Sequence, residues 1–239
     1  FKKGDRTDIE LPAVQRELID ALHRAGKKII LVNCSGSPIG LEPETQKCEA
    51  ILQAWYPGQQ GGKAVAEVLF GDYNPAGKLP VTFYRNVSQL PDFEDYNMTG
   101  RTYRYMQDVP LFPFGYGLSY TTFGYGKTVL DKNELTAGQS LKLTVPVTNT
   151  GKRNGEEVVQ VYLRKQGDAE GPIKTLRAFK RVSIPAGKTV NVEFDLKDKE
   201  LEWWDDQSNT VRVCPGNYDI MVGGSSKEED LQRTTIAIK

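Results

Sequence analysis

The chain has 239 residues, a length that suits one or two domains with a hydrophobic core in each. Lys and Arg together number 31, as do Asp and Glu, so the formal charge is zero and no basic surface favours nucleic acid. No apolar run approaches the roughly 18–20 residues that a membrane span needs. These features argue against a nucleic-acid-binding protein and against a membrane-spanning helix.

Three cysteines, Cys34, Cys48 and Cys214, lie far apart in the sequence and include no CxxC pair. This spacing argues against a metal site, and we expect neither a metal nor a cofactor. One disulfide would be compatible with the count. An odd number of scattered thiols, however, favours buried and free cysteines.

Residues 1–88 alternate helix and strand signals, as is typical of an α/β domain. Pro12 suits the first turn of a helix, and Gly26 is placed to end it. Four apolar residues between them fall on one helical face: Val14, Leu18, Ile19 and Leu22. We expect this face to be the buried one.

Three strands are expected in the same region. Residues 29–32 form a continuous apolar run that is typical of a parallel strand buried on both faces. A second strand is expected at 50–55 and a third at 79–83, with a helix over 61–70 between them. This order predicts an open parallel sheet.

Residues 89–122 break this pattern because they are rich in Pro, Gly and aromatic residues. Flexible linkers are rich in Gly and Ser and contain few aromatics. Phe112, Phe114, Tyr116 and Tyr120 are all available for burial. We therefore expect a linker that is packed against both neighbouring domains.

Residues 123–239 follow a hydrophobic period of two, which indicates strands with one buried face. Alternation is clearest at 141–147 and 190–194, and further strands are expected at 156–165, 174–183, 216–222 and 233–239. About seven short strands in roughly 115 residues predict an immunoglobulin-like or fibronectin-III-like sandwich.

Several motifs, in the same order, resemble one family. They are GDRTDIELPAVQRELI at 4–19, VLFGDYNPAGKLPVTF at 68–83, PFGYGLSYTTF at 113–123, LRAFKRVSIPAGKTVNVEFDL at 176–196 and PGNYDIMVGGSS at 215–226. The chain resembles the carboxyl-terminal part of a family 3 glycoside hydrolase of the β-glucosidase and β-xylosidase type, over nearly its whole length. The resemblance implies the end of an α/β sandwich domain over 1–88, a packed linker over 89–122 and a fibronectin-III-like sandwich over 123–239.

The family's chemistry is retaining hydrolysis of a terminal β-linked sugar, which needs a carboxylate nucleophile and a carboxylic acid about 5–5.5 Å apart. The resemblance places the nucleophilic Asp on a preceding TIM-like barrel, of which this sequence has no trace. It places the acid/base Glu close upstream of the GDR-x-x-x-x-LP stretch, where Phe1, Lys2 and Lys3 supply no carboxylic acid. Both catalytic carboxylates are therefore expected upstream of Phe1, with none in this chain.

Other titratable residues have simpler interpretations. Asp5 and Arg6 suit a local charge pair, and nothing marks Asp5 or Glu10 as a carboxyl group with a raised pKa. His23, the single histidine, has no neighbour that would argue for a catalytic triad, and we expect it at the surface. The acidic cluster at 92–95 is expected to be a solvated bend.

Candidate substrate contacts are Trp55, Tyr56, Arg101 and Tyr103, because sugar sites use aromatic faces and planar polar groups. Ligands of open sheets lie beyond the carboxyl ends of the strands, which here means the turns at 33–38 and 55–59, and Trp55 and Tyr56 belong to the second of these. Interdomain packing for Trp55, and linker packing for the GRTYRY segment at 100–105, are the competing interpretations.

The pair Trp203-Trp204 resembles an exposed carbohydrate-binding platform. Because neighbouring strand residues point to opposite faces, at least one of the two should point inward, and core or edge packing is the competing interpretation.

The leading hypothesis is a part of a retaining, exo-acting β-glycosidase that cleaves terminal β-linked glucose or xylose. This part itself is expected to be inactive, to complete the cleft and to brace the domains. The alternative is a stand-alone carbohydrate-binding or adhesive β-sandwich module.

The expected partners are a β-linked oligosaccharide or glycoside and the missing N-terminal barrel. An exposed patch around Trp55, Tyr56 and the linker aromatics also predicts some self-association. Bacterial members of the family are often secreted or periplasmic, which suggests a periplasmic or extracellular location.

Overall fold

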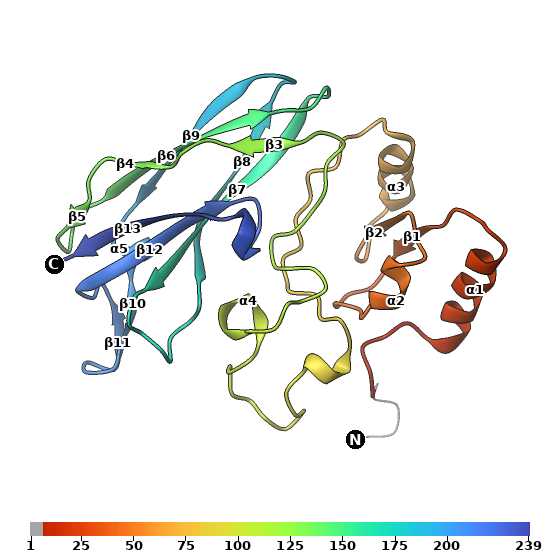
Figure 1. Ribbon diagram of the computed structural model, residues 1–239, viewed down its shortest axis with the longest axis horizontal. Helices are drawn as coiled ribbons and strands as arrows, with labels where there is room; N and C mark the ends of the chain where they lie inside the picture. The colour runs from red at the N-terminus through yellow and green to blue at the C-terminus, as the bar shows by residue number, and fades with distance from the viewer. Residues whose placement is uncertain (1–6) are drawn as a thin grey trace. The chain divides into compact units, whose positions relative to one another are not determined.

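The computed structural model describes residues 7–239 and divides them into two compact units, each described here by itself (Figure 1). Unit 1 consists of the described residues up to Tyr73 together with Val81–Thr102 and Met106–Pro113. Unit 2 consists of Asn74–Pro80, Tyr103–Tyr105 and Phe114–Lys239. The expected linker at 89–122 is thus shared between the two units, and so is the 68–83 motif.

Unit 1 is built mainly from short helices and one small sheet. Its elements are α1 (Ala13–Arg24), β1 (Ile30–Asn33), α2 (Glu42–Thr45), β2 (Ala50–Gln53), α3 (Gly61–Phe70) and the 3-10 turn η1 (Val87–Gln89). The two longer helices confirm the sequence expectation: Pro12 precedes α1, and Gly71 ends α3 with φ 81°. Glycine suits that position because a side chain disfavours the left-handed conformation.

Strands β1 and β2 pair in parallel, with Ile30 opposite Ala50 and Asn33 opposite Gln53. The strand expected at 79–83 does not form. Within unit 1 its end makes only an isolated antiparallel bridge, Phe83 with Phe112, and Pro80 lacks the N–H that a continued ladder would need. The expectation of a strand buried on both faces is also wrong, because Ile30 is 54% exposed in this two-stranded sheet.

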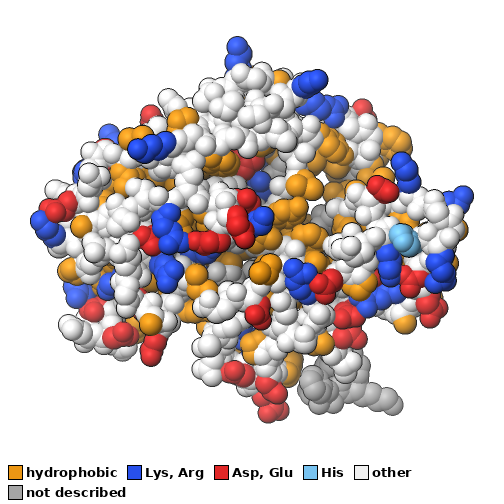
Figure 2. All heavy atoms as spheres, in the orientation of Figure 1, with side chains coloured by type: hydrophobic (Ala, Val, Ile, Leu, Met, Phe, Trp, Pro, Cys, Tyr) orange, Lys and Arg blue, Asp and Glu red, His pale blue; other side chains and the backbone are white. Residues whose placement is uncertain are grey.

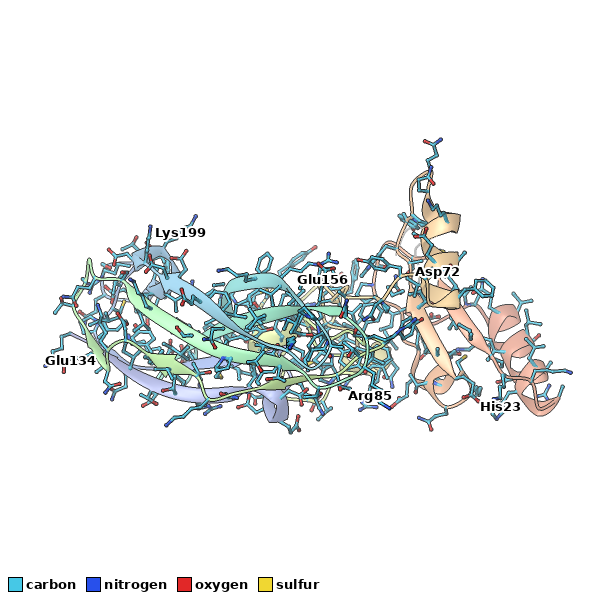
Figure 3. The ribbon with its side chains drawn as sticks, turned by 90° about the horizontal axis from the view of Figure 1, so that it is seen from above. His23, Asp72, Arg85, Glu134, Glu156 and Lys199 are labelled. Carbon is cyan, nitrogen blue, oxygen red and sulfur yellow. The ribbon has the colours of Figure 1, made fainter. Side chains whose placement is uncertain are left out.

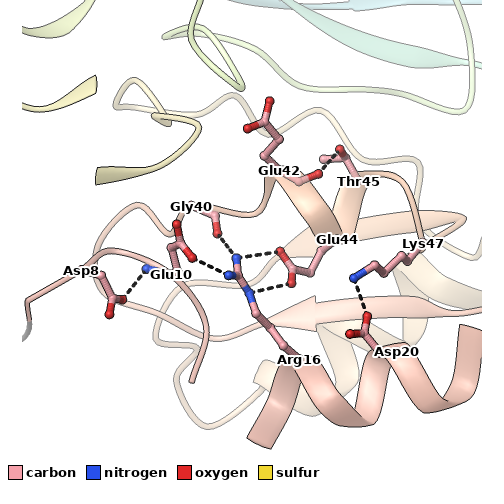
Figure 4. A network of polar contacts seen from close by, with 9 residues as sticks. All are labelled: Asp8, Glu10, Arg16, Asp20, Gly40, Glu42, Glu44, Thr45 and Lys47. Atoms are coloured by element: carbon pink, nitrogen blue, oxygen red, sulfur yellow. Dashed lines mark hydrogen bonds and ion pairs between the residues drawn. The ribbon is translucent and has the colours of Figure 1, made fainter. Parts of the chain in front are cut away.

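Helix α1 is held mainly by ion pairs. Of the four apolar residues expected on its buried face only Ile19 is buried, whereas Val14, Leu18 and Leu22 are exposed. The Arg16 guanidinium, which lies on the same helix, contacts the carboxylates of Glu10 and Glu44 and the carbonyl oxygen of Gly40 (Figure 4). Lys47 forms a third ion pair, with Asp20 of α1.

Unit 2 is a β-sandwich, as the period-two pattern predicts. One sheet has the order β5-β13-β12-β7-β8, and the other has the order β3-β6-β4 with β9 paired to β6. The strands are β3 (Phe123–Tyr125), β4 (Val129–Leu130), β5 (Glu134–Leu135), β6 (Leu141–Asn149), β7 (Gly155–Lys165), β8 (Thr175–Ile184), β9 (Thr189–Leu196), β10 (Trp203–Asp205), β11 (Thr210–Arg212), β12 (Gly216–Gly223) and β13 (Gln232–Ile238). The helical turns are α4 (Thr102–Tyr105, whose first residue belongs to unit 1), α5 (Asp198–Leu201) and η2 (Glu228–Asp230).

Alternate residues of β6 and β9 fill the core of this sandwich. Leu141, Leu143, Val145 and Val147 are fully buried and face Val192 and Leu196. β7 is buried over most of its length on both faces. Its outer face is covered by aromatics of the expected linker, since the Tyr103 ring lies 4.3 Å from that of Phe114 and 5.9 Å from that of Tyr162.

Three further expectations concern single residues. Phe112, Phe114 and Tyr116 are half-buried, but Tyr120 is exposed, contrary to expectation. The cysteines are free thiols, yet of the three only Cys214 is buried as expected, since Cys48 is half-buried and Cys34 is exposed. Trp203 is buried and Trp204 is not, which confirms that at least one of this pair points inward.

Candidate functional site

The carboxyl ends of β1 and β2 lie side by side in unit 1, where a parallel sheet gathers its ligands. Asn33 ends β1 and is buried, and its Nδ2 donates to Gln53 Oε1 at 2.6 Å and to Ser35 Oγ at 3.0 Å. Gln53 Nε2 in turn donates to Ser35 Oγ at 3.2 Å. These bonds tie the turn after β1 to the last residue of β2, so the edge of the sheet is a fixed structure.

Trp55 and Tyr56 follow this network and lie in different environments. Trp55 has φ 56°, an unfavourable backbone conformation for so large a residue, and its ring packs edge-to-face on Phe83 at 6.1 Å. Tyr56 is 79% exposed, yet its ring lies against Gly36 so closely that a Cβ at position 36 would come within 2.5 Å of Tyr56 Cε2. Tyr56 therefore presents an aromatic ring to solvent while one side of it rests on bare backbone.

Arg101 also belongs to unit 1, where its guanidinium closes the loop that precedes it. Nε donates to the carbonyl oxygen of Asn97 at 2.9 Å, and Nη2 donates to those of Asp92, at 3.3 Å, and Asp95. The side chain thus braces residues 92–101 from within. Asp92 and Asp95 each accept a backbone N–H two residues further on, which makes the acidic cluster a pair of turns.

Tyr103 belongs to unit 2, where it has a packing role. Its ring stacks on Phe114, and its hydroxyl accepts a hydrogen bond from the backbone N–H of Leu176 at 3.2 Å. Of the four candidate contacts, Trp55, Tyr56 and Arg101 are therefore in one unit and Tyr103 is in the other.

The remaining titratable candidates are placed as follows. Asp5 and Arg6 lie outside the described residues, so the charge pair expected there stays a prediction. Glu10 and Glu44 share Arg16, and Glu44 is fully buried, so both carboxylates belong to an ion-pair network within unit 1. His23 is exposed on the last turn of α1 (Figure 3).

The sequence indicated the turn at 33–38, which contains Asn33 and Gly36, as a place for a ligand, but it did not single out Gln53. A polar residue directly after an apolar strand indicates a side chain at the ligand-binding edge of a parallel sheet, and Asn33 follows the apolar run at 29–32 in this way. The contact between Gly36 and Tyr56 joins positions 20 residues apart, and no local pattern indicates it.

The surface drawn in Figure 2 carries hydrophobic side chains among intermingled acidic and basic ones, in keeping with the balanced charge. Over residues 7–239, no helix is both long enough and apolar enough to cross a bilayer. The structure thus combines a small α/β unit with a fibronectin-III-like β-sandwich. The chain is therefore of the class of multidomain proteins that join an α/β domain to a β-sandwich domain.

Comparison with known proteins identifies the family. Residues 2–120 match the glycosyl hydrolase family 3 C-terminal domain, and residues 157–226 match the fibronectin type III-like domain. The chain belongs to glycosyl hydrolase family 3, as its sequence motifs predicted.

Relatives and solved structures agree with this assignment. The chain is 58% identical to a xylan 1,4-β-xylosidase of Xylanibacter ruminicola, over 100% of this chain and 27% of that protein. It is 39% identical to a periplasmic β-glucosidase of Salmonella typhimurium, over 93% of this chain and 31% of that protein. A β-glucosidase structure from Erythrobacter marinus matches with a TM-score of 0.86 and 42% identity, over 99% of this chain and 31% of its own. The chain thus spans about a third or less of the length of these proteins.

Proposed function

We propose that this chain is the part of a retaining, exo-acting β-glycosidase that completes the rim of the sugar-binding cleft and braces the domains around it. The support is similarity along nearly the whole chain to proteins named β-xylosidase and β-glucosidase. The substrate is a terminal β-linked xylose or glucose of an oligosaccharide or glycoside. The catalytic carboxylates belong to parts of the parent enzyme that this chain does not include, among them a TIM-like barrel.

The observation that carries the rim role is the placement of Tyr56. Its ring is exposed at the carboxyl end of β2 and rests on Gly36, and the network of Asn33, Ser35 and Gln53 fixes the turn beneath it. An aromatic ring held in this way offers a flat apolar face to a sugar at little cost in conformational entropy. Trp55 supports Tyr56 through its contact with Phe83, and in this proposal it touches no sugar.

A titration of the isotopically labelled chain with xylotriose and cellotriose, followed by NMR, tests the Tyr56 contact. Signals of Gly36 and Tyr56 should shift in the wild type, and the Gly36 signal should stay unchanged on titration of Tyr56→Ala. Gly36→Ala should weaken the response, because the new Cβ would displace the ring. Tyr96→Ala is the matched control, since Tyr96 is a strongly exposed aromatic residue of the same unit. Unchanged signals at Gly36 and Tyr56 in the wild type would contradict the contact.

The catalytic part of the proposal has a separate test. The purified chain should not release nitrophenol from aryl β-xylosides or β-glucosides above a matched blank. Turnover by the purified chain would show that a carboxylate pair within it is active, and would overturn the assignment of the chemistry to other parts of the enzyme.

We also propose a bacterial source and a periplasmic or extracellular location. The support is the similarity to the Salmonella protein that is named periplasmic, and to other bacterial glycosidases. The exposed apolar residues of unit 1, among them Val14, Leu18 and Phe70, support the proposal that other parts of the parent enzyme cover this unit. The isolated chain should then self-associate through them, and light scattering that shows a strict monomer would count against this.

A further inference from the structure

The hairpin of β10 and β11 in unit 2 presents one tryptophan to solvent beside another that is buried. The two strands pair antiparallel, and Trp204 lies directly opposite Val211. Trp204 is 49% exposed and Val211 is 51% exposed. Residues opposite each other in an antiparallel pair project to the same face, so the two side chains form one continuous apolar surface.

The buried neighbour anchors this hairpin to the sandwich. The indole Nε1 of Trp203 donates to Asp168 Oδ2 at 2.6 Å, and the Arg177 guanidinium lies 5.7 Å from the centre of its ring. The Tyr218 ring meets Trp203 edge-on at 6.1 Å. The base of the hairpin is therefore held by buried contacts on several sides.

The tip of the hairpin is held by polar contacts. Asp205 accepts hydrogen bonds from Arg212 Nε at 2.7 Å and from Ser208 Oγ at 2.6 Å. Trp204 Nε1 donates to Asp206 Oδ1 at 2.8 Å, which sets the orientation of the exposed ring. Because the ring is already oriented, a ligand that stacks on it loses little binding energy to ordering the side chain.

The chemistry of this surface indicates the class of ligand. A flat indole face next to an aliphatic side chain matches the C–H face of a pyranose ring, and the Asp206 carboxylate at its edge can accept hydrogen bonds from sugar hydroxyls. Asp205 and Asp206 disfavour an anionic ligand, and Arg212 is already paired with Asp205. Two exposed side chains fall far short of the roughly 800 Å² per partner that a stable protein interface buries, which disfavours a protein partner.

We propose that Trp204, Val211 and Asp206 form a shallow accessory site that binds one or two units of a neutral β-linked oligosaccharide. The site belongs to the sandwich and is made only of residues from one hairpin. It does not depend on the rim contact proposed for Tyr56.

Indole NMR signals of the whole chain, labelled with ¹⁵N, test this site by titration with xylohexaose and cellohexaose. The chain has 3 Trp, and the signal of Trp204 can be assigned by its loss in Trp204→Ala. This signal should shift and saturate with a Kd of about 1 mM, as expected for a small open surface. Trp55, beside Tyr56, reports on the rim separately, so failure at one place is distinguished from failure at the other.

Variants make the test decisive. Trp204→Ala should weaken binding at this site roughly tenfold or more, and Asp206→Ala should weaken it less, because the ring remains but loses its hydrogen bond. Binding to these two variants is read from the backbone amide signals of Thr210 and Val211. Phe179→Ala is the matched control, since Phe179 is exposed on β8 and should leave binding unchanged. A wild-type Trp204 signal that does not move, or equal affinity in all four proteins, would overturn the proposal. If Trp204→Ala does not fold, Trp204→Phe and Asp206→Ala decide the question.

Discussion

Replacing Arg101 with Ala separates a loop-bracing role from a substrate-binding role. The guanidinium donates to three backbone carbonyl oxygens, those of Asp92, Asp95 and Asn97. A hydrogen bond from a charged donor contributes about 1.5–3 kcal/mol when buried, and these bonds lie at an exposed or half-exposed loop. We therefore expect the three together to stabilise the closed loop by about 2 kcal/mol.

Hydrogen exchange of the backbone amides measures this effect directly. Amides bonded within the loop, such as those of Asp95 and Arg101, should exchange roughly 30-fold faster in Arg101→Ala, as about 2 kcal/mol of local stability implies. Arg101→Lys should behave in nearly the same way, because an ammonium group cannot span the three carbonyls in the geometry of a guanidinium. Arg24→Ala, at an exposed arginine of α1, is the control.

Loop exchange that is unchanged in Arg101→Ala would refute the bracing role. A loss of sugar binding together with normal loop exchange would instead favour Arg101 as a direct contact.

Three further predictions concern stability. Gly71→Ala should lower the free energy of unfolding of unit 1 by about 1 kcal/mol in urea, because residue 71 has φ 81°. Gly77→Ala is the comparison: a Cβ at that position would meet open space, so the loss in free energy should be smaller. Trp203→Phe should destabilise the sandwich by about 1–3 kcal/mol, since the bond to Asp168 and part of the buried ring are lost, whereas an unchanged unfolding midpoint would refute the anchoring role. Hydrogen bonds from Ser208 and Arg212 lower the pKa of Asp205 to about 2, so its stabilising effect should be complete above the unfolded pKa near 3.8 and fade as the pH falls toward 2. The difference in unfolding midpoint between the wild type and Asp205→Asn should accordingly shrink on acidification, and a difference that is constant with pH would contradict this.

Local pattern was sufficient for most of the sandwich and for the longer helices. Strands β6 and β9 follow the predicted alternation, because every second side chain of a half-buried strand must be apolar. Strands β7, β8, β12 and β13 form close to the ranges that the sequence predicts. Helix α3 begins and ends where its flanking residues predict. The family also followed from the sequence, since its motifs keep their order along the whole chain.

Local pattern failed where a residue's role depends on contacts distant in the chain. The apolar face of α1 predicts burial, but only Ile19 of its four residues is buried, and the Arg16 guanidinium of the same helix contacts Glu10 and Glu44. The run at 79–83 has the composition of a strand, yet a strand exists only if a partner completes its ladder, and Pro80 interrupts this one. The expectation that Cys34 is buried failed for the same reason. Whether a side chain is buried depends on the segments that pack against it.

The sequence by itself determined the family, the order of an α/β unit and a β-sandwich, and the side-chain types suited to a sugar. Only the tertiary structure decided how these side chains are used. It rests Tyr56 on Gly36, directs Arg101 to its own loop, packs Tyr103 under Phe114, and leaves Trp204 in solvent while Trp203 is buried. The physical reason is that a periodic pattern records which face of an element is apolar, whereas the partner of each side chain is set by segments that meet only when the chain folds.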